Sequence, residues 1–230
     1  MSKPRKNKKA PGPCPDPSRY ILVDGKAGKY WRLKRGTLKP AKLNSSWEVS
    51  RRNTQISSPA ARQIMAKLAP FTAGMDAYGR AGALSGMLRK SLNVKGNIDY
   101  SFFKDFDMQQ DFPLSKVLMA EFIVAQRSDI LSITIPLGNE PVKAHNRLVT
   151  DYFFEAILLH GDPTQDNGLR VESDQSPLYS FGKVMEGTCT LILQLPGDTM
   201  WMVWLKVSCV ENDRPAVHPK HHGMKVVAVG

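Results

Sequence analysis

Apolar residues are spaced as in helices in the first half of the chain and as in strands in the second half. One set in the first half has the i, i+3, i+4 and i+7 spacing of a single helix face: Ala61, Ile64, Met65 and Leu68. Ser58 suits an N-cap, Pro59 suits the first helical position, and Pro70 ends the pattern. The sequence therefore predicts a helix that begins at Ser58 and ends before Pro70.

A second helix is predicted from about Tyr78 to Leu92. Its inward-facing residues are Leu84, Met87, Leu88 and Leu92. Arg89 and Lys90 fall in the last turn, where cations interact favourably with the helix dipole. Residues 93–116 have no clear period, but they contain four phenylalanines that we expect to be buried: Phe102, Phe103, Phe106 and Phe112.

From Glu121 onward, short runs rich in Val, Ile, Leu and aromatic residues are separated by turn residues, which is typical of a β-sandwich. The candidate strands are 120–126, 130–135, 149–159, 169–172, 178–183, 188–195, 200–210 and 224–229. The clearest alternation predicts nine residues at the centre of the core: Cys189, Leu191, Leu193, Leu195, Trp201, Val203, Leu205, Val207 and Cys209.

The three cysteines, which include Cys14, indicate a reducing compartment rather than a disulfide framework. If 188–195 pairs with 201–210 around the turn at Pro196, Cys189 lies opposite Val207 and only diagonal to Cys209. Diagonal neighbours are about 7–8 Å apart, which is beyond the usual reach of a disulfide. We therefore favour two buried thiols over a bridge.

The segment before the helices is predicted to be a hairpin with a basic second strand. Two β-prone runs, 19–23 and 29–36, flank a loop that contains Gly25 and Gly28. Residues 1–18 are rich in Lys, Arg and Pro and poor in apolar residues, which is typical of a disordered tail. The layout is thus α+β: a basic tail over 1–18, a hairpin plus two helices over 19–117, and an antiparallel, immunoglobulin-like β-sandwich over 118–230.

Positive charge is concentrated at the start of the chain. Residues 1–62 hold sixteen Lys or Arg against three acids, a net charge of +13, whereas residues 63–230 hold sixteen against eighteen, a net charge of −2. Such segregation predicts that the first section binds a polyanion, most plausibly nucleic acid, through residues 1–36. The candidate contacts are Lys26, Lys29, Arg32, Lys34 and Arg35 for phosphates and Tyr30 and Trp31 for stacking.

Two other interpretations of this basic section stay open. Tyr30 and Trp31 would equally suit packing of the hairpin onto the helices, while the cations keep the chain soluble and protect an exposed edge strand. A basic tail also suits a structural subunit that is anchored in a larger particle, such as a phage or mobile-element assembly. In both cases the cations would not recognise a nucleic-acid site.

Motifs for catalysis or cofactor binding are not recognisable, so we expect a non-enzymatic protein without a cofactor. Val23 and Tyr30 stand where a phosphate-binding loop around Gly25–Lys29 would need Gly and Ser or Thr. The histidines at 218, 221 and 222 lack acidic or thiolate companions at metal-binding spacing, so no metal is expected. An acid cluster over 151–166 leaves open an enzyme of unrecognised type.

The chain is not expected to enter a membrane. Its longest apolar stretches, such as 130–137 and 153–159, are far shorter than the roughly 20 residues that cross a bilayer. The basic start is followed by a Pro-rich segment rather than the apolar segment of a signal peptide. A cytoplasmic location is therefore the expectation.

The order of these features resembles an uncharacterised bacterial family, a domain of unknown function. The shared features are a helix start at a proline, a terminal sandwich with a Leu–Pro turn, and a basic hairpin with Gly25, Lys26, Gly28, Tyr30 and Arg32. The helix start is Ser58–Pro59 here, where the family usually has Thr–Pro. The resemblance implies a helical linker between a small basic hairpin and an immunoglobulin-like sandwich. Our own hypothesis is that the sandwich serves as a platform for a protein partner. It implies no catalytic residues.

Overall fold

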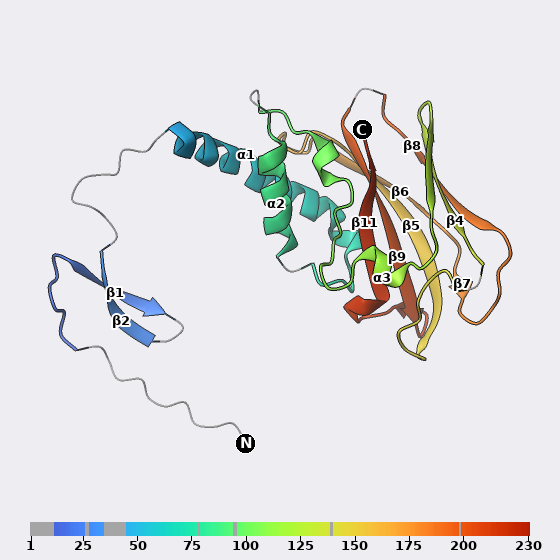
Figure 1. Ribbon diagram of the computed structural model, residues 1–230, viewed down its shortest axis with the longest axis horizontal. Helices are drawn as coiled ribbons and strands as arrows, with labels where there is room; N and C mark the ends of the chain where they lie inside the picture. Colours follow the sequence, from blue (N-terminus) through green and yellow to red (C-terminus); the bar gives the residue numbers. More distant parts are fainter. Residues whose placement is uncertain are drawn as a thin grey trace, which may run out of the picture. The chain divides into compact units, whose positions relative to one another are not determined.

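The computed structural model describes residues 12–25, 28–34, 45–77, 79–93, 96–138, 140–197 and 199–230 (Figure 1). The chain divides into two compact units, Met1–Glu48 and Val49–Gly230. The sequence prediction placed a division at residue 118 instead, between helices and sandwich. In the structure the helices share a hydrophobic core with strands of a large sheet, which is why both fall in the second unit.

The first unit contains the predicted hairpin. Strands β1 (Tyr20–Gly25) and β2 (Gly28–Leu33) pair antiparallel. A turn precedes β1, because the amides of Arg19 and Tyr20 both donate to the Asp16 carbonyl, at 3.0 and 2.9 Å. This turn lies within the segment 1–18, which composition predicts to be a disordered tail, and residues 1–11 lie outside the described residues.

The first helix is twice as long as the sequence predicted. Helix α1 (Ser45–Leu68) contains Pro59 in its interior, so the predicted start at Ser58 was wrong. The Ser58 hydroxyl does not cap the helix but lies 3.2 Å from the Ser85 hydroxyl of the next helix. An interior proline removes one backbone hydrogen bond without ending the helix. The predicted apolar stripe is confirmed by the burial of Ala61, Ile64 and Leu68.

The second helix and the segment after it follow the prediction in part. The 3₁₀ turn η1 (Ala69–Phe71) ends α1, and α2 (Arg80–Ser91) has Arg89 and Lys90 in its last turn, as predicted. The described residues of 93–118 contain the short elements η2 (Tyr100–Phe103) and α3 (Leu114–Val117). Phe103 and Phe106 are buried as expected, Phe112 is partly buried, and Phe102 is half exposed, which corrects the expectation for Phe102.

The second half of the chain forms two largely antiparallel sheets, so the α+β class is confirmed. The larger sheet has the order β10-β9-β5-β6, and β11 also pairs with β9 while β7 pairs with β5. Its strands are β5 (Val149–Gly161), β6 (Leu169–Gln175), β7 (Tyr179–Ser180), β9 (Trp201–Glu211), β10 (Arg214–Pro215) and β11 (His222–Val229). The turn η3 (Pro219–His221) precedes β11.

The smaller sheet has the order β3-β4-β8. Its strands are β3 (Ile123–Arg127), β4 (Ile130–Pro136) and β8 (Thr188–Gln194). Strand β8 therefore pairs with β4, and β9 pairs with β5 and β11, so the direct pairing of 188–195 with 201–210 does not form. The turn after Pro196 carries the chain from one sheet to the other instead.

The nine predicted core residues nevertheless lie together. All nine belong to one buried cluster that contains residues of both sheets. Alternation correctly identified the residues that face this core, but β9 is buried on both faces, and the two strands meet across the core rather than side by side. Cys189 and Cys209 are both buried and free, as favoured from the sequence.

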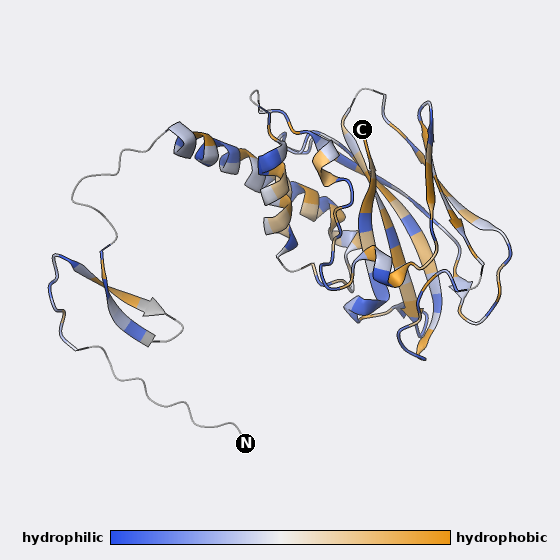
Figure 2. Ribbon diagram, viewed as in Figure 1, coloured by the Kyte–Doolittle hydropathy of each residue, from blue (hydrophilic) through white to orange (hydrophobic). Residues whose placement is uncertain are grey.

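A second core lies on the other face of the large sheet. Its helix residues include Ile64, Leu68, Leu84 and Leu88, and its strand residues include Trp204. Phe106 packs edge-on against Trp204, with ring centroids 5.9 Å apart. Figure 1 shows α1 and α2 on one side of the large sheet and β4 and β8 on the other, and Figure 2 shows hydrophobic residues concentrated in the strands between.

Candidate nucleic-acid interface

The hairpin has one face that gathers its cations. Pairing places Ile21 opposite Arg32 and Val23 opposite Tyr30, and the Lys34 amide donates to the Arg19 carbonyl at 2.6 Å. Directly opposite residues share a face of an antiparallel ladder. We call this side the cationic face, and its polar and aromatic members are Arg19, Tyr30, Arg32 and Lys34.

The opposite face of the hairpin is aromatic and aliphatic. Leu22 lies opposite Trp31, and Tyr20 lies opposite Leu33. The Trp31 indole donates from Nε1 to the Gly12 carbonyl at 2.7 Å. Trp31 thus ties the segment before the hairpin to β2, a structural role that the sequence prediction did not include, whereas Tyr30 is 46% exposed on the cationic face.

Two cations of β2, Arg32 and Lys34, form no ion pair within the described residues. Arg19 lies 3.7 Å from Asp16, and Lys29 lies opposite Asp24 in the ladder. The Arg32 Nε is enclosed and has no hydrogen-bond partner there. Bonds from Ser18, first from its side chain, lower the pKa of Asp16, and Lys34 contributes weakly to this shift. Arg32 and Lys34 therefore present donors that form no ion pair with a carboxylate of the described residues.

The structure brings only some of the predicted contact residues together. Tyr30, Arg32 and Lys34 share the cationic face, while Lys29 and Trp31 lie on the other face by register. Lys26 and Arg35 lie outside the described residues. Arg19 was not among the predicted contact residues. The hairpin register places it on the cationic face, two residues before Ile21 and opposite Lys34.

The acid cluster over 151–166 is divided among different partners. Glu155 Oε2 lies 2.9 Å from the Lys206 amine, and Asp151 accepts a hydrogen bond from Ser180 at 2.7 Å. The Ser180 bond is the largest cause that lowers the pKa of Asp151. His160 lies 3.5 Å from Glu172. These carboxylates do not converge on one point, so the arrangement does not resemble an acid–base pair.

Four histidines gather near η3. The His221 ring lies 6.2 Å from His145 and 6.0 Å from His218, between centroids, and the His222 Nδ1 lies 3.1 Å from the Ser208 hydroxyl. The sequence grouped His218, His221 and His222, and the fold adds His145 from a distant loop. Within the described residues, no group of three or more His, Cys, Asp or Glu side chains is placed to hold a metal ion.

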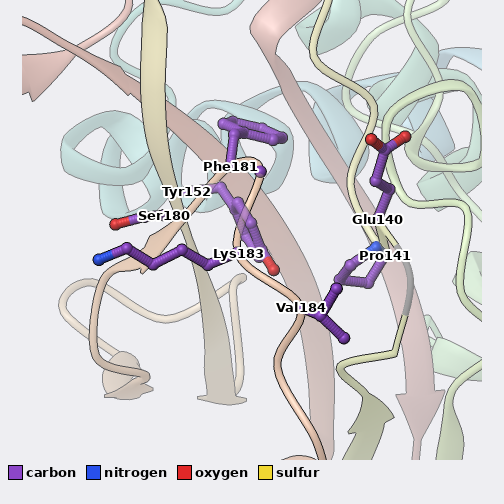
Figure 3. Close-up of a pocket in the computed structure, with 8 residues that line it drawn as sticks. Glu140, Pro141, Tyr152, Ser180, Phe181, Lys183 and Val184 are labelled. Atoms are coloured by element: carbon purple, nitrogen blue, oxygen red, sulfur yellow. The ribbon is translucent and has the colours of Figure 1, made fainter.

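A small pocket lies where β7 approaches the loop before β5. It has a volume of about 200 Å³ and is lined by Glu140, Pro141, Tyr152, Ser180, Phe181, Gly182, Lys183 and Val184. The rings of Tyr152 and Phe181 have centroids 4.9 Å apart. Figure 3 shows the Ser180 hydroxyl and the Lys183 amine on one side of the pocket and the Glu140 carboxylate on the other. Its polar groups therefore do not converge as they do in most ligand sites.

Comparison with known proteins adds no family. No protein-family model matches the chain, and no curated protein is significantly similar to it. Among solved structures, the chain is weakly similar to the solution structure of R. palustris CsgH, with 7% identity and a TM-score of 0.22 over 44% of this chain and 91% of that chain. A similarity this weak carries no argument. No helix in the described part of the chain is long and apolar enough to cross a membrane.

Proposed function

We propose that the protein is a non-enzymatic binding protein whose basic N-terminal section contacts nucleic acid. The observation that carries the proposal is the cationic face of the hairpin, where Arg32 and Lys34 lie beside the exposed ring of Tyr30 without carboxylate partners among the described residues. Cations bind phosphates and release counterions, and an exposed aromatic face stacks on bases. Affinity would be salt-dependent and largely independent of sequence.

The second unit would then serve as a platform for a protein partner. Two antiparallel sheets that enclose one core support an immunoglobulin-like sandwich, in keeping with the resemblance to a bacterial domain of unknown function. A cytoplasmic location suits nucleic-acid binding and the free, buried Cys189 and Cys209. The alternative is a structural subunit of a larger particle, which the exposed outer face of the small sheet favours, with Ile123 and Ile192 66% and 56% exposed.

Fluorescence anisotropy with labelled single-stranded DNA, single-stranded RNA and duplex DNA over a salt series tests the proposal. Arg32→Gln with Lys34→Gln should reduce the slope of log affinity against log salt by about 1.4–1.8, since each phosphate contact contributes about 0.7–0.9. Lys183→Gln with Lys220→Gln removes the same charge from the sandwich and should leave the slope nearly unchanged.

Deletion of residues 1–36 gives the broader test. Binding at low salt should be lost in the deleted protein. If all three nucleic acids bind the deleted and full-length proteins equally, the hairpin is not the interface. If the full-length protein binds none of them, the particle-subunit alternative gains.

A further inference from the structure

Strand β3 is an edge strand with one side of its backbone open. Within the described residues it pairs only with β4, through a hairpin in which Arg127 lies opposite Ile130 and two residues form the loop. The two residues that flank a two-residue loop exchange backbone hydrogen bonds. Along the strand, every second residue then bonds to the partner strand, and the residues between point their N–H and C=O groups the other way. Residues 123, 125 and 127 therefore bond to β4, and the backbone N–H and C=O groups of Val124 and Gln126 point away from it.

The open side of β3 borders a cleft between the two sheets. The cleft measures about 270 Å³, and its lining includes Val124 and Gln126 from β3 and residues 227–229 from β11. A second hollow of about 450 Å³ is lined by the preceding segment, 118–122, and by Lys225. No backbone hydrogen bond reaches the outer side of β3 from the described residues. The strand edge is thus accessible along its length.

Two other strand edges of this body, those of β8 and β11, are blocked. On β8, the Ile192 amide donates to the Asp174 carboxylate at 2.7 Å, so a side chain from β6 occupies that edge. On β11, Val226 exchanges backbone bonds with residues 105 and 106. Proteins protect exposed edges by such means, and an unprotected edge is a template for another strand. Among these three edges, only that of β3 is bonded neither to a side chain nor to another backbone segment of the described residues.

We propose that β3 pairs antiparallel with β3 of a second copy of this chain, about a two-fold axis at Ala125. The pairing would join two three-stranded sheets into one six-stranded sheet. The axis places Val124 opposite Gln126 of the second copy, and Ile123 opposite Arg127 of the second copy. Arg127 is the strand's one charged residue, so no like charges face each other, and like charges directly opposite would oppose pairing.

This register makes a second copy a better occupant than an unrelated strand. The central Ala125 meets its own equivalent, so two small side chains lie at the axis. The outer face on both sides of the new joint is continuous with Ile123, Ile130 and Ile192, which are 66%, 43% and 56% exposed. Such an interface is isologous, and it closes at two copies.

Sedimentation equilibrium of the nuclease-treated, full-length protein tests the proposal through charge at one position. Ile123→Lys puts a cation opposite Arg127 of the second copy at two symmetric places, and should raise the dimer dissociation constant by up to about tenfold. Ile123→Glu puts an anion there and should lower that constant by a similar factor. Ile123 is exposed, so neither change should disturb folding, which circular dichroism checks.

Ile192→Lys and Ile192→Glu are the matched controls, because Ile192 is similarly exposed on β8, whose edge Asp174 blocks. They should leave the dissociation constant unchanged. In an Arg127→Glu background, Ile123→Lys should lower the dimer dissociation constant and Ile123→Glu should raise it, and this reversal would support the register. A wild-type protein that stays monomeric at every concentration, or Lys and Glu at position 123 that act alike, would overturn the proposal.

Discussion

The amine of Lys206 lies 2.9 Å from the carboxylate of Glu155, and the two residues are direct cross-strand partners on β9 and β5. Their side chains are only 9% and 10% exposed. The amine also lies 5.7 Å from the centre of the Phe153 ring. The large sheet therefore carries an ion pair on its helix-facing side, in line with the apolar residues of the second core. This pair is a structural element rather than half of an acid–base site.

Loss of one partner of this pair should be far more harmful than loss of both. Lys206→Met leaves a buried carboxylate without its cation, and should lower the free energy of unfolding by about 3–5 kcal/mol. Lys206→Met together with Glu155→Leu leaves no unpaired charge and should cost much less. Urea denaturation of the three proteins measures the difference. Equal losses in the single and double variants would show that the pair is not coupled.

The three cysteines should react with a thiol reagent at two very different rates. Cys14 is partly exposed, whereas Cys189 and Cys209 are buried. Burial raises the pKa of Cys209 to about 12 and also raises the pKa of Cys189, which keeps both as unreactive thiols. Ellman's reagent should therefore modify one thiol quickly in the native protein and all three in urea. Cys14→Ser should remove the fast phase, and a fast phase that persists would contradict the burial.

Stability should fall as the solution is acidified, in part through His221. Its side chain is 1% exposed, and burial, followed by Lys220, lowers its pKa from 6.5 to about 4. The unfolded chain binds a proton near pH 6.5 and the native protein only near pH 4, so stability present above pH 6.5 is lost progressively towards pH 4. Lys220 and the neighbouring His145, His218 and His222 disfavour the charged form in the same way.

Urea midpoints between about pH 7 and pH 4 test this dependence. His221→Leu should flatten the decline, because the native and unfolded states then no longer differ in proton binding at this position. Some decline should remain, since burial also lowers the pKa of His145 and His222. If the urea midpoint of His221→Leu depends on pH as steeply as that of the wild type, burial does not hold the His221 imidazole neutral.

Tyr30 should contribute stacking rather than charge. Tyr30→Ala removes the exposed ring from the cationic face, and should weaken binding to single-stranded nucleic acid by roughly 1–3 kcal/mol without changing the salt slope. Duplex DNA, whose bases are already stacked, should be affected much less. Anisotropy titrations with matched single- and double-stranded probes measure both effects. Equal losses for the two probes would assign Tyr30 to the structure of the hairpin instead.

The alternation of apolar residues located most strands to within a few residues. Strand β9 was predicted over 200–210 and spans Trp201–Glu211. The nine residues predicted for the core all belong to one buried cluster. This worked because every second residue of β8 is buried, and the residues predicted from β9 lie on the face that packs against the same core. The N-terminal hairpin could also be predicted, because its two strands and its loop lie within one short segment of the sequence.

The pairing of strands was decided by the tertiary structure. Nothing local distinguishes a strand that pairs with its neighbour in sequence from one that faces it across a core, and β8 and β9 do the latter. The same limit applies to α1, where Ser58 and Pro59 carry a start signal but Ser58 instead contacts Ser85. The gathering of His145 with His221 also depends on a distant loop.

The amino-acid sequence by itself determined which residues are buried, where most strands lie and where the cations are concentrated. The tertiary structure decided which strands share a sheet, that Glu155 is paired with Lys206, and that the edge of β8 is blocked while that of β3 is open. The physical reason is that burial and charge are properties of single positions, whereas partners and free edges exist only once distant segments have met.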